Sequence, residues 1–142
     1  ELIGKVFPAA EPAISELAYS PFFTQYAGTI NGLGRYAALF IAAMEKLTGQ
    51  AGLRHLTMLP WQDLLPHNGQ GLLARHPRWC PVCLFQQRLR DQETVIPLIW
   101  SLEAVQICMT HRRHLEGQCP HCGRRQPFIP RYPDLAICDY CH

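Results

Sequence analysis

The sequence predicts a small α+β protein in which a helical N-terminal half, residues 1–74, precedes a cysteine-rich module in residues 75–142. Two observations lead to this prediction. Apolar residues recur at helical spacing in the first half, which has no cysteine, and all seven cysteines lie after residue 79. A chain of 142 residues can bury one modest core, or two small ones if bound metal ions add stability.

Seven cysteines and one histidine form four pairs in which two residues separate the members. A two-residue spacer lets the backbone turn so that both side chains face one ion, and two tetrahedral Zn²⁺ ions need eight such ligands. The sequence therefore predicts two zinc ions in a double zinc-ribbon-like module, with closed ligand sets that leave no position open for catalysis. The predicted ligands are Cys80, Cys83, Cys108, His111, Cys119, Cys122, Cys138 and Cys141.

A disulfide framework is the main alternative explanation of the cysteines. The odd number of cysteines argues against it, and so does the histidine in the eighth position, because only a metal accepts a histidine in place of a cysteine. Iron–sulfur ligation and redox-active thiols are weaker alternatives. Metal-bound thiolates fit a reducing compartment, so we expect a cytoplasmic protein. No stretch of the sequence approaches the ~20 apolar residues that a membrane-spanning helix needs, so we expect it to be soluble.

The spacing leaves open how the four pairs share the two ions. Sequential pairing joins the first two pairs and the last two pairs, with internal spans of 24 and 15 residues that suit zinc-ribbon-like hairpins. Cross-braced pairing joins the first pair to the third, and the entropy of loop closure grows too slowly with span to exclude it. We favour sequential pairing. The six histidines that complete no pair are predicted not to bind metal: His55, His67, His76, His114, His121 and His142.

Several motifs follow one another in a specific order. The sequence reads LRHLTMLPW at 53–61, RWCPVCL at 78–84, CMTH at 108–111 and CPHCG at 119–123, with Trp100 eight residues before the second cysteine pair and Leu115 before the third. Together these motifs resemble the TniQ family, which includes the TnsD-type target selectors of bacterial transposons. The resemblance covers roughly residues 33–141, and its specificity lies in the ordered combination.

The resemblance implies an adaptor function. Members of the family connect a target-recognising component, either DNA itself or an RNA-guided complex, to an AAA+ ATPase of the transposon. The expected partners are therefore a TnsC-like ATPase, a targeting complex and target DNA, with no membrane and no small-molecule substrate. Many relatives begin with a helix-turn-helix region, of which residues 1–74 are expected to hold at most a remnant. Relatives usually continue beyond the point where this chain stops, so we expect a domain of a longer protein.

Two other classes of function compete with the adaptor. An autonomous zinc-ribbon module that binds DNA or RNA is the alternative, because it would use the same closed metal sites. An enzyme is not expected, since the sequence has no paired carboxylates near a nucleophile and no Gly-rich phosphate loop of the Walker type.

Charge is distributed unevenly along the chain. The formal net charge of +2 falls to about −1 once seven thiolates and two Zn²⁺ ions are counted, so contacts with nucleic acid must come from local clusters. Residues 75–142 contain nine arginines and no lysine, and arginine pairs bidentately with phosphate or carboxylate. Six arginines are candidate contacts with nucleic acid or a protein partner: Arg88, Arg90, Arg112, Arg113, Arg124 and Arg125.

The first half is expected to be mainly helical after an extended N-terminal lead. We predict a short helical turn at 14–18, a helix from Ser20 to Ile30 and a second helix at about 33–47 that ends before Gly49. Another helical turn is expected at 60–65, and the glycine-rich segment 68–71 is expected to be a linker. The first long helix should present Phe22, Phe23 and Tyr26 on one face. The apolar stripe of the second should consist of Leu39, Phe40, Ala43, Met44 and Leu47.

The second half offers fewer periodic signals. We predict a short helix at 84–90 with Arg88 and Arg90 exposed, and a strand or the entry to a helix at 94–100. Trp100 is expected to pack over the first zinc site, because a small metal module has few large side chains for its core. A docking surface for the protein partner is expected to include Trp61, Arg88 and Arg90. For Trp79 two alternatives stay open: it is part of that surface, or it is buried.

Overall fold

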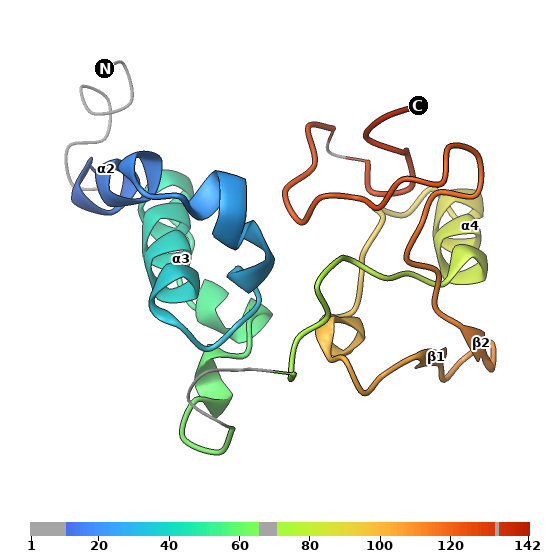
Figure 1. The fold of residues 1–142 in the computed structure, drawn as a ribbon, viewed down its shortest axis with the longest axis horizontal. Helices are drawn as coiled ribbons and strands as arrows, with labels where there is room; N and C mark the ends of the chain where they lie inside the picture. Colours follow the sequence, from blue (N-terminus) through green and yellow to red (C-terminus); the bar gives the residue numbers. More distant parts are fainter. Residues whose placement is uncertain (1–10, 66–70, 133) are drawn as a thin grey trace. The chain divides into compact units, whose positions relative to one another are not determined.

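The computed structural model describes residues 11–65, 71–132 and 134–142. The chain divides into two compact units, Glu1–Gln70 and Gly71–His142. The first unit is helical, and the second combines one α-helix with a two-stranded sheet and long loops (Figure 1). The predicted α+β class, with a helical first half and a zinc-ribbon-like second half, is confirmed. Separate roles for residues 1–74 and 75–142 stay a prediction. Within the described ranges, no helix is both long and apolar enough to cross a membrane.

Two α-helices form the framework of the first unit. Helix α2, Glu11–Tyr19, packs against helix α3, Arg35–Thr48 (Figure 1). The sequence predicted only one turn at 14–18, but the helix begins at Glu11 because Pro12 is tolerated in a first turn, where its missing N–H would have no partner. Helix α3 ends as predicted, since Gly49 adopts a left-handed φ of 69° and donates its N–H to the carbonyl of Glu45 at 3.0 Å.

The buried face of α3 differs from the predicted stripe. Ala37, Ile41 and Ala43 are buried. Ala37 and Ile41 form a core with Leu59, against which Phe40 and Leu53 pack. Of the predicted stripe, Ala43 is buried and Phe40 is partly buried against this core. Leu39, Met44 and Leu47 are only half-buried. Small side chains such as Ala37 let neighbouring segments approach the helix closely, which a search for large apolar residues overlooks.

The segment between the two helices is helical but not α-helical, so the prediction of one continuous helix was wrong. The π-helical turn η1, Phe22–Tyr26, is followed by the 3₁₀ turn η2, Ala27–Thr29. Ser20 Oγ accepts a hydrogen bond from the N–H of Phe22 at 3.2 Å, but the N-cap residue of η1 is Pro21 and the turn has no side-chain cap, so the predicted capping by Ser20 was wrong. A π-turn is wider than an α-turn, so the three aromatics do not share a face. Phe22 is fully buried, whereas Phe23 and Tyr26 are exposed.

The first unit closes with two 3₁₀ turns, η3 at Leu53–Leu56 and η4 at Leu59–Trp61. The N–H of Leu65 donates to the carbonyl of Trp61 at 3.1 Å, so the helical turn expected at 60–65 is present. Trp61 is 55% exposed. Residues 66–70, with most of the predicted linker and His67, lie outside the described residues.

The second unit contains helix α4, Pro81–Leu89, the 3₁₀ turn η5, Leu98–Ser101, and a hairpin of β1, Ile107–Cys108, with β2, Arg113–His114. The strands are antiparallel, with Ile107 opposite His114. Helix α4 begins three residues earlier than predicted, because Pro81 is well suited to a first helical position. A strand at 94–100 was one of two expectations and is wrong: the chain there is irregular and then enters η5.

The core of the second unit surrounds the first cysteine cluster. Cys80, Trp100 and Cys108 are buried together. Trp100 therefore packs over the first predicted metal site, as expected. Trp79 is partly buried against the same core, so its own unit accounts for its burial. Other apolar side chains complete this core: Val82, Ile96, Val105 and Leu115.

Candidate metal centres

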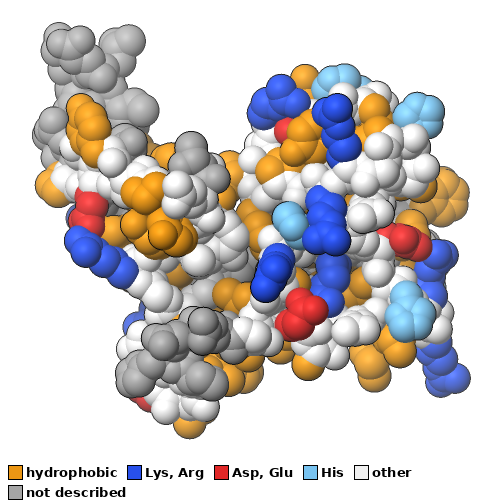
Figure 2. Space-filling view, viewed as in Figure 1, with side chains coloured by type: hydrophobic (Ala, Val, Ile, Leu, Met, Phe, Trp, Pro, Cys, Tyr) orange, Lys and Arg blue, Asp and Glu red, His pale blue; other side chains and the backbone are white. Residues whose placement is uncertain are grey.

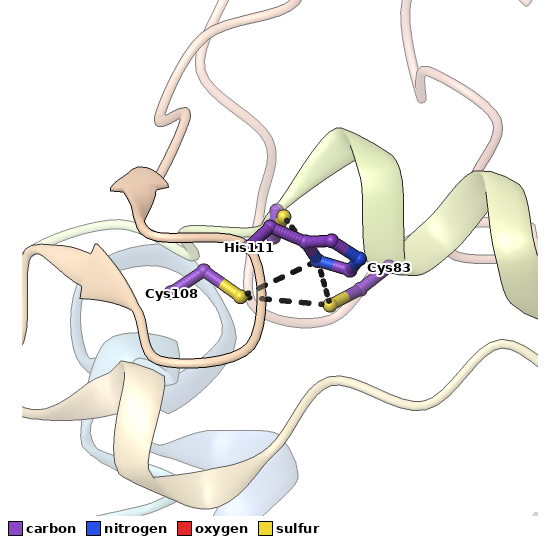
Figure 3. Close-up of side chains that lie close together, drawn as sticks. Cys83, Cys108 and His111 are labelled. Carbon is purple, nitrogen blue, oxygen red and sulfur yellow. Dashed lines mark hydrogen bonds between the residues drawn. The ribbon is translucent and has the colours of Figure 1, made fainter.

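Four predicted ligands converge in the first cluster. They are Cys80, Cys83, Cys108 and His111, whose ligand atoms all lie within 4.8 Å of one another. Figure 3 shows Cys83 projecting from α4 towards Cys108 and His111 on the hairpin. Cys83 Sγ lies 3.2 Å from His111 Nδ1 and 3.6 Å from Cys108 Sγ, and Cys108 Sγ lies 3.7 Å from His111 Nδ1.

These separations match those around a tetrahedral zinc ion. Bonds of ~2.3 Å to sulfur and ~2.0 Å to nitrogen at tetrahedral angles place ligand atoms about 3.5–3.8 Å apart. The Cys80 Sγ to His111 Nδ1 distance is 3.5 Å, and the other measured distances lie within a few tenths of this range. A disulfide would need its sulfurs ~2.05 Å apart, whereas Cys83 and Cys108 are separated by 3.6 Å. The geometry therefore favours a metal over a disulfide.

The second cluster consists of Cys119, Cys122, Cys138 and Cys141, again with all ligand atoms within 4.8 Å. Cys119 Sγ lies 3.7 Å from Cys141 Sγ, and Cys122 Sγ lies 3.6 Å from Cys138 Sγ. Both distances fit a tetrahedral ion bound by four thiolates. The structure thus groups the first two pairs and the last two pairs, which is the sequential arrangement. It does not have the cross-braced arrangement.

Three of the four pairs are positioned by the same backbone turn. The N–H of the residue after the second ligand donates to the carbonyl of the first, from Arg112 to Cys108 at 2.8 Å and from Gly123 to Cys119 at 2.8 Å. The third turn joins His142 to Cys138 at 3.2 Å. The residues that donate these bonds have positive φ angles of 49°, 69° and 56°. The turn curls the chain around the ion, and only Gly123 adopts this conformation without steric cost.

The remaining pair makes the same backbone hydrogen bond, but its chain continues into a helix instead of turning away through a residue of positive φ. Cys80 caps α4 and Cys83 lies in its first turn, where residues three apart share one face. The N–H of Leu84 donates to the carbonyl of Cys80 at 3.1 Å, which fixes this turn. Helix α4 therefore contributes two ligands as a rigid unit, and the hairpin contributes the other two.

The thiols within a cluster differ in acidity. Burial on its own would raise the pKa of Cys108, but hydrogen bonds from the backbone and ring of His111 and from neighbouring thiols lower it to about 6. Burial and the thiols of Cys108 and Cys80 raise the pKa of Cys83 to about 12. In the second cluster the pKa of Cys138 is lowered to about 6, against the effect of burial, by hydrogen bonds from the backbone of Tyr140 and Cys141. Four thiolates repel one another at such distances, and a dication would remove this repulsion.

A polar network that the sequence analysis missed supports the second cluster. The Nε2 of Gln126 donates to Cys138 Sγ at 3.2 Å, and its Oε1 accepts the N–H of Asp139 at 2.8 Å. The buried carboxylate of Asp139 accepts bonds from the N–H of Arg131 at 2.7 Å and from its Nε at 3.0 Å. These bonds hold the pKa of Asp139 below its usual range despite burial, and the bond from the Arg131 backbone has the largest effect. No spacing rule marks Gln126, so the sequence offered no signal for it.

The six candidate contact arginines lie on different elements and are all exposed. Arg88 and Arg90 are at the end of α4, as predicted. Arg113 on the hairpin pairs with Glu116 at 3.3 Å, and the guanidinium of Arg124 lies 5.1 Å from the centre of the Tyr140 ring. Arg112 and Arg125 complete the set, whose role as contacts stays a prediction. Among the histidines that the structure describes, only His111 belongs to a cluster.

Comparison with known proteins supports the resemblance seen in the motifs. A family model described as TniQ matches residues 29–115, which is more than half of the chain. The matched segment contains α3 and the whole first cluster and ends before the second. None of the curated proteins matches the chain.

Proposed function

The chain belongs to the TniQ family, and from this we propose that it is a zinc-holding adaptor in DNA transposition. In this proposal it connects the component that recognises the target site to the AAA+ ATPase of the transposon, a TnsC-like protein. The observation that carries the proposal is the family match, which includes the four converging side chains of the first cluster.

The two clusters would each hold one zinc ion. Their donor sets, three thiols with one imidazole and four thiols, are typical of structural zinc, which supplies folding energy and no open coordination position. Closed sites fit a protein that positions its partners and catalyses no reaction itself. The proposal therefore does not include an enzymatic activity.

Helix α4 provides the surface that suits a protein partner best. Phe85 and Leu89 are 62% and 70% exposed, and Arg88 is exposed between them. Residues three and four apart share one helix face, so this face combines an aromatic, an arginine and a leucine. Exposed aromatic and arginine side chains on a rigid scaffold are common among the residues that dominate binding energy. We propose that the ATPase or the targeting complex docks on this face of α4, which Arg90 follows directly. Trp61 of the first unit is exposed and is a separate candidate contact.

Capture of the purified ATPase by the zinc-loaded chain tests this proposal. The variant R88E/R90E should capture at least about 10-fold less ATPase than the wild type, because it reverses the charge of the α4 face. The control K46E/R54E makes the same charge change at exposed positions of the first unit and should capture normally. Equal capture by R88E/R90E would remove α4 from the interface, and a metal-dependent hydrolase activity of the chain would contradict the adaptor function.

An autonomous module that binds DNA or RNA is the second candidate. It is favoured by Arg124, which follows a metal-anchored turn and stacks over Tyr140. Such a module should bind duplex DNA without any protein partner, with an affinity that falls steeply as salt rises. An adaptor should in addition capture the ATPase, whereas an autonomous module should not, so capture of the ATPase separates the two functions.

A further inference from the structure

The second unit contains a groove whose lining is rich in arginine. Its volume is about 690 Å³. The charged and titratable side chains that line it are Arg75, His76, Arg78, Glu103, Glu116 and Arg125. Figure 2 shows blue side chains, which are all arginine in this unit, beside a histidine on its visible face. Arg125 is among the six arginines that the sequence predicts as partner contacts, whereas Arg75 and His76 are not.

The walls of the groove are held by backbone hydrogen bonds. On one side, Ala74 donates its N–H to the carbonyl of Ser101 at 2.8 Å. On the other, Trp79 and Glu116 exchange two hydrogen bonds, of 2.9 and 2.7 Å. Arg75 and His76 lie between these two attachments. Arg125 comes from the turn of the third cysteine pair, where the N–H of Cys119 donates to the carbonyl of Arg124 at 2.8 Å. The basic side chains are therefore carried by a backbone that is already ordered.

The acidic groups of the groove already have partners. Glu116 pairs with Arg113 at 3.3 Å, and Glu103 lies 4.0 Å from Arg78. Arg78 also donates hydrogen bonds to the carbonyl groups of Trp100 and Leu102, so its guanidinium is already engaged by the backbone of the groove.

Arg75 and Arg125 differ from these groups, because neither forms an ion pair with a carboxylate in the described part of the chain. Both act on His76, whose pKa is lowered by burial first and then by the charges of Arg125 and Arg75. The groove therefore contains two guanidinium groups that form no ion pair in the described residues, next to an imidazole that can donate a hydrogen bond.

We propose that this groove binds the phosphate groups of a nucleic-acid backbone through Arg75, His76 and Arg125. Arginine forms charge-assisted, bidentate hydrogen bonds with phosphate oxygens. An acidic protein segment fits less well, because the described lining has no aromatic side chain and only Leu73 and Ala74 as apolar ones, whereas protein interfaces rely on buried apolar anchors. The inference deepens the proposed function and rests on it only for the source of the nucleic acid, which is the transposition target.

Direct titration of DNA tests the inference. A labelled duplex of about 20 base pairs and arbitrary sequence is titrated with the zinc-loaded full chain at several salt concentrations. For R75Q/R125Q we expect affinity at low salt to fall about 10-fold or more. The slope of log K against log salt should become shallower by about 2, because each lost phosphate contact removes ~0.9. A duplex of unrelated sequence should respond equally, since phosphate contacts carry no sequence information.

Matched variants separate this site from a general effect of charge. K46Q/R54Q removes the same charge from exposed positions of the first unit, outside the groove, and should leave the salt slope unchanged. If R75Q/R125Q lost zinc by elemental analysis, the single variant R75Q would replace it, because Arg75 is exposed and in no described ion pair. Its slope should become shallower by about 1.

Three outcomes would overturn the inference. The first is an unchanged slope in the groove variants, and the second is an equal change in K46Q/R54Q. In the third outcome the wild type binds a polyglutamate peptide but not DNA, and R75Q/R125Q abolishes the binding of the peptide. That result would assign the groove to an acidic protein partner. No ATPase is present in these titrations, so their failure would leave the adaptor function standing.

Discussion

Gln126 links Cys138 of the second cluster to the polar network around Asp139, because it donates to Cys138 Sγ and accepts from the Asp139 backbone. Partners of this kind orient a ligand, and their loss typically lowers metal affinity 10–100-fold. We expect Q126A to weaken zinc binding at the second cluster about 10-fold, measured by competition with a chromogenic chelator. Q106A is the control, because Gln106 is exposed and only its backbone carbonyl has a described hydrogen bond. Equal affinities of the two variants would exclude this role.

His76 reports on the charge of the groove. A nearby cation disfavours the imidazolium form, so removing Arg125 should raise the pKa of His76 towards the ordinary value of 6.5. The rise should be incomplete, because burial is the larger cause and Arg75 remains. NMR titration of the His76 ring in R125Q measures this change, and R90Q is the control. An unchanged pKa in R125Q would place the guanidinium too far away to act on the groove.

Local spacing in the sequence predicted the residues of both clusters, but it did not predict the side chains that hold those residues in place. Two residues between cysteines suffice to bring both thiols to one ion, so all eight candidates could be identified without the fold. The contacts of Gln126 and Asp139 depend on how a loop of 15 residues folds back between Cys122 and Cys138. Hydrogen bonds across such a loop have no fixed sequence interval, and therefore no sequence motif predicts them.

Among the secondary-structure elements, the end of α3 depends on a glycine. Gly49 has a φ of 69°, where a side chain costs about 1–2 kcal/mol. We therefore expect G49A to reduce the free energy of unfolding of the first unit by about that amount, measured by urea titration of the helical circular dichroism signal. G34A is a matched control, since Gly34 has a φ of −89° and an added Cβ at either glycine meets no atom within 4 Å. Equal losses would mean that the left-handed conformation is not the cause.

The core around the first cluster depends on one large side chain. Trp100 is 5% exposed and packs with Cys80 and Cys108. Replacing a buried tryptophan by alanine typically costs 3–5 kcal/mol, so W100A should lower the stability of the zinc-loaded second unit by about that amount. W61A should change stability by less than about 1 kcal/mol, because Trp61 is 55% exposed. Chemical unfolding of the two variants measures the difference, and a small loss in W100A would contradict the proposed packing.

The helices also show where sequence periodicity stops being informative. Helix α3 could be predicted to within about two residues, because its repeat and its terminal glycine act locally. The segment from Phe22 to Thr29 could not, since its winding follows from the burial of one ring. Phe22 lies 5.6 Å from the Tyr36 ring and 5.8 Å from the Phe40 ring, both on α3. Tertiary packing of that ring selects a π-turn over the α-helix that local spacing favours.

For the molecule as a whole, the two units differ in what stabilises them. In its described residues, the first unit has an apolar core around α3 and no candidate metal cluster. The second unit has one short α-helix, a hairpin of two-residue strands and two clusters of ligands. Such a small amount of regular structure buries little apolar surface, so we expect metal binding to supply much of its folding energy.

Removing metal should therefore unfold one unit and spare the other. We expect two zinc ions per chain by elemental analysis. After chelation, α2 and α3 should keep their helical circular dichroism signal while the NMR signals of residues 79–141 collapse to those of an unfolded chain. Single substitutions divide the effect further: C108S should lose the ion of the first cluster and leave the Cys119 and Cys122 contacts intact, and C138S should do the reverse. A chain that keeps its second unit folded with one ion or none would contradict two structural zinc sites. Loss of the Cys119 contacts in C108S would contradict the sequential grouping.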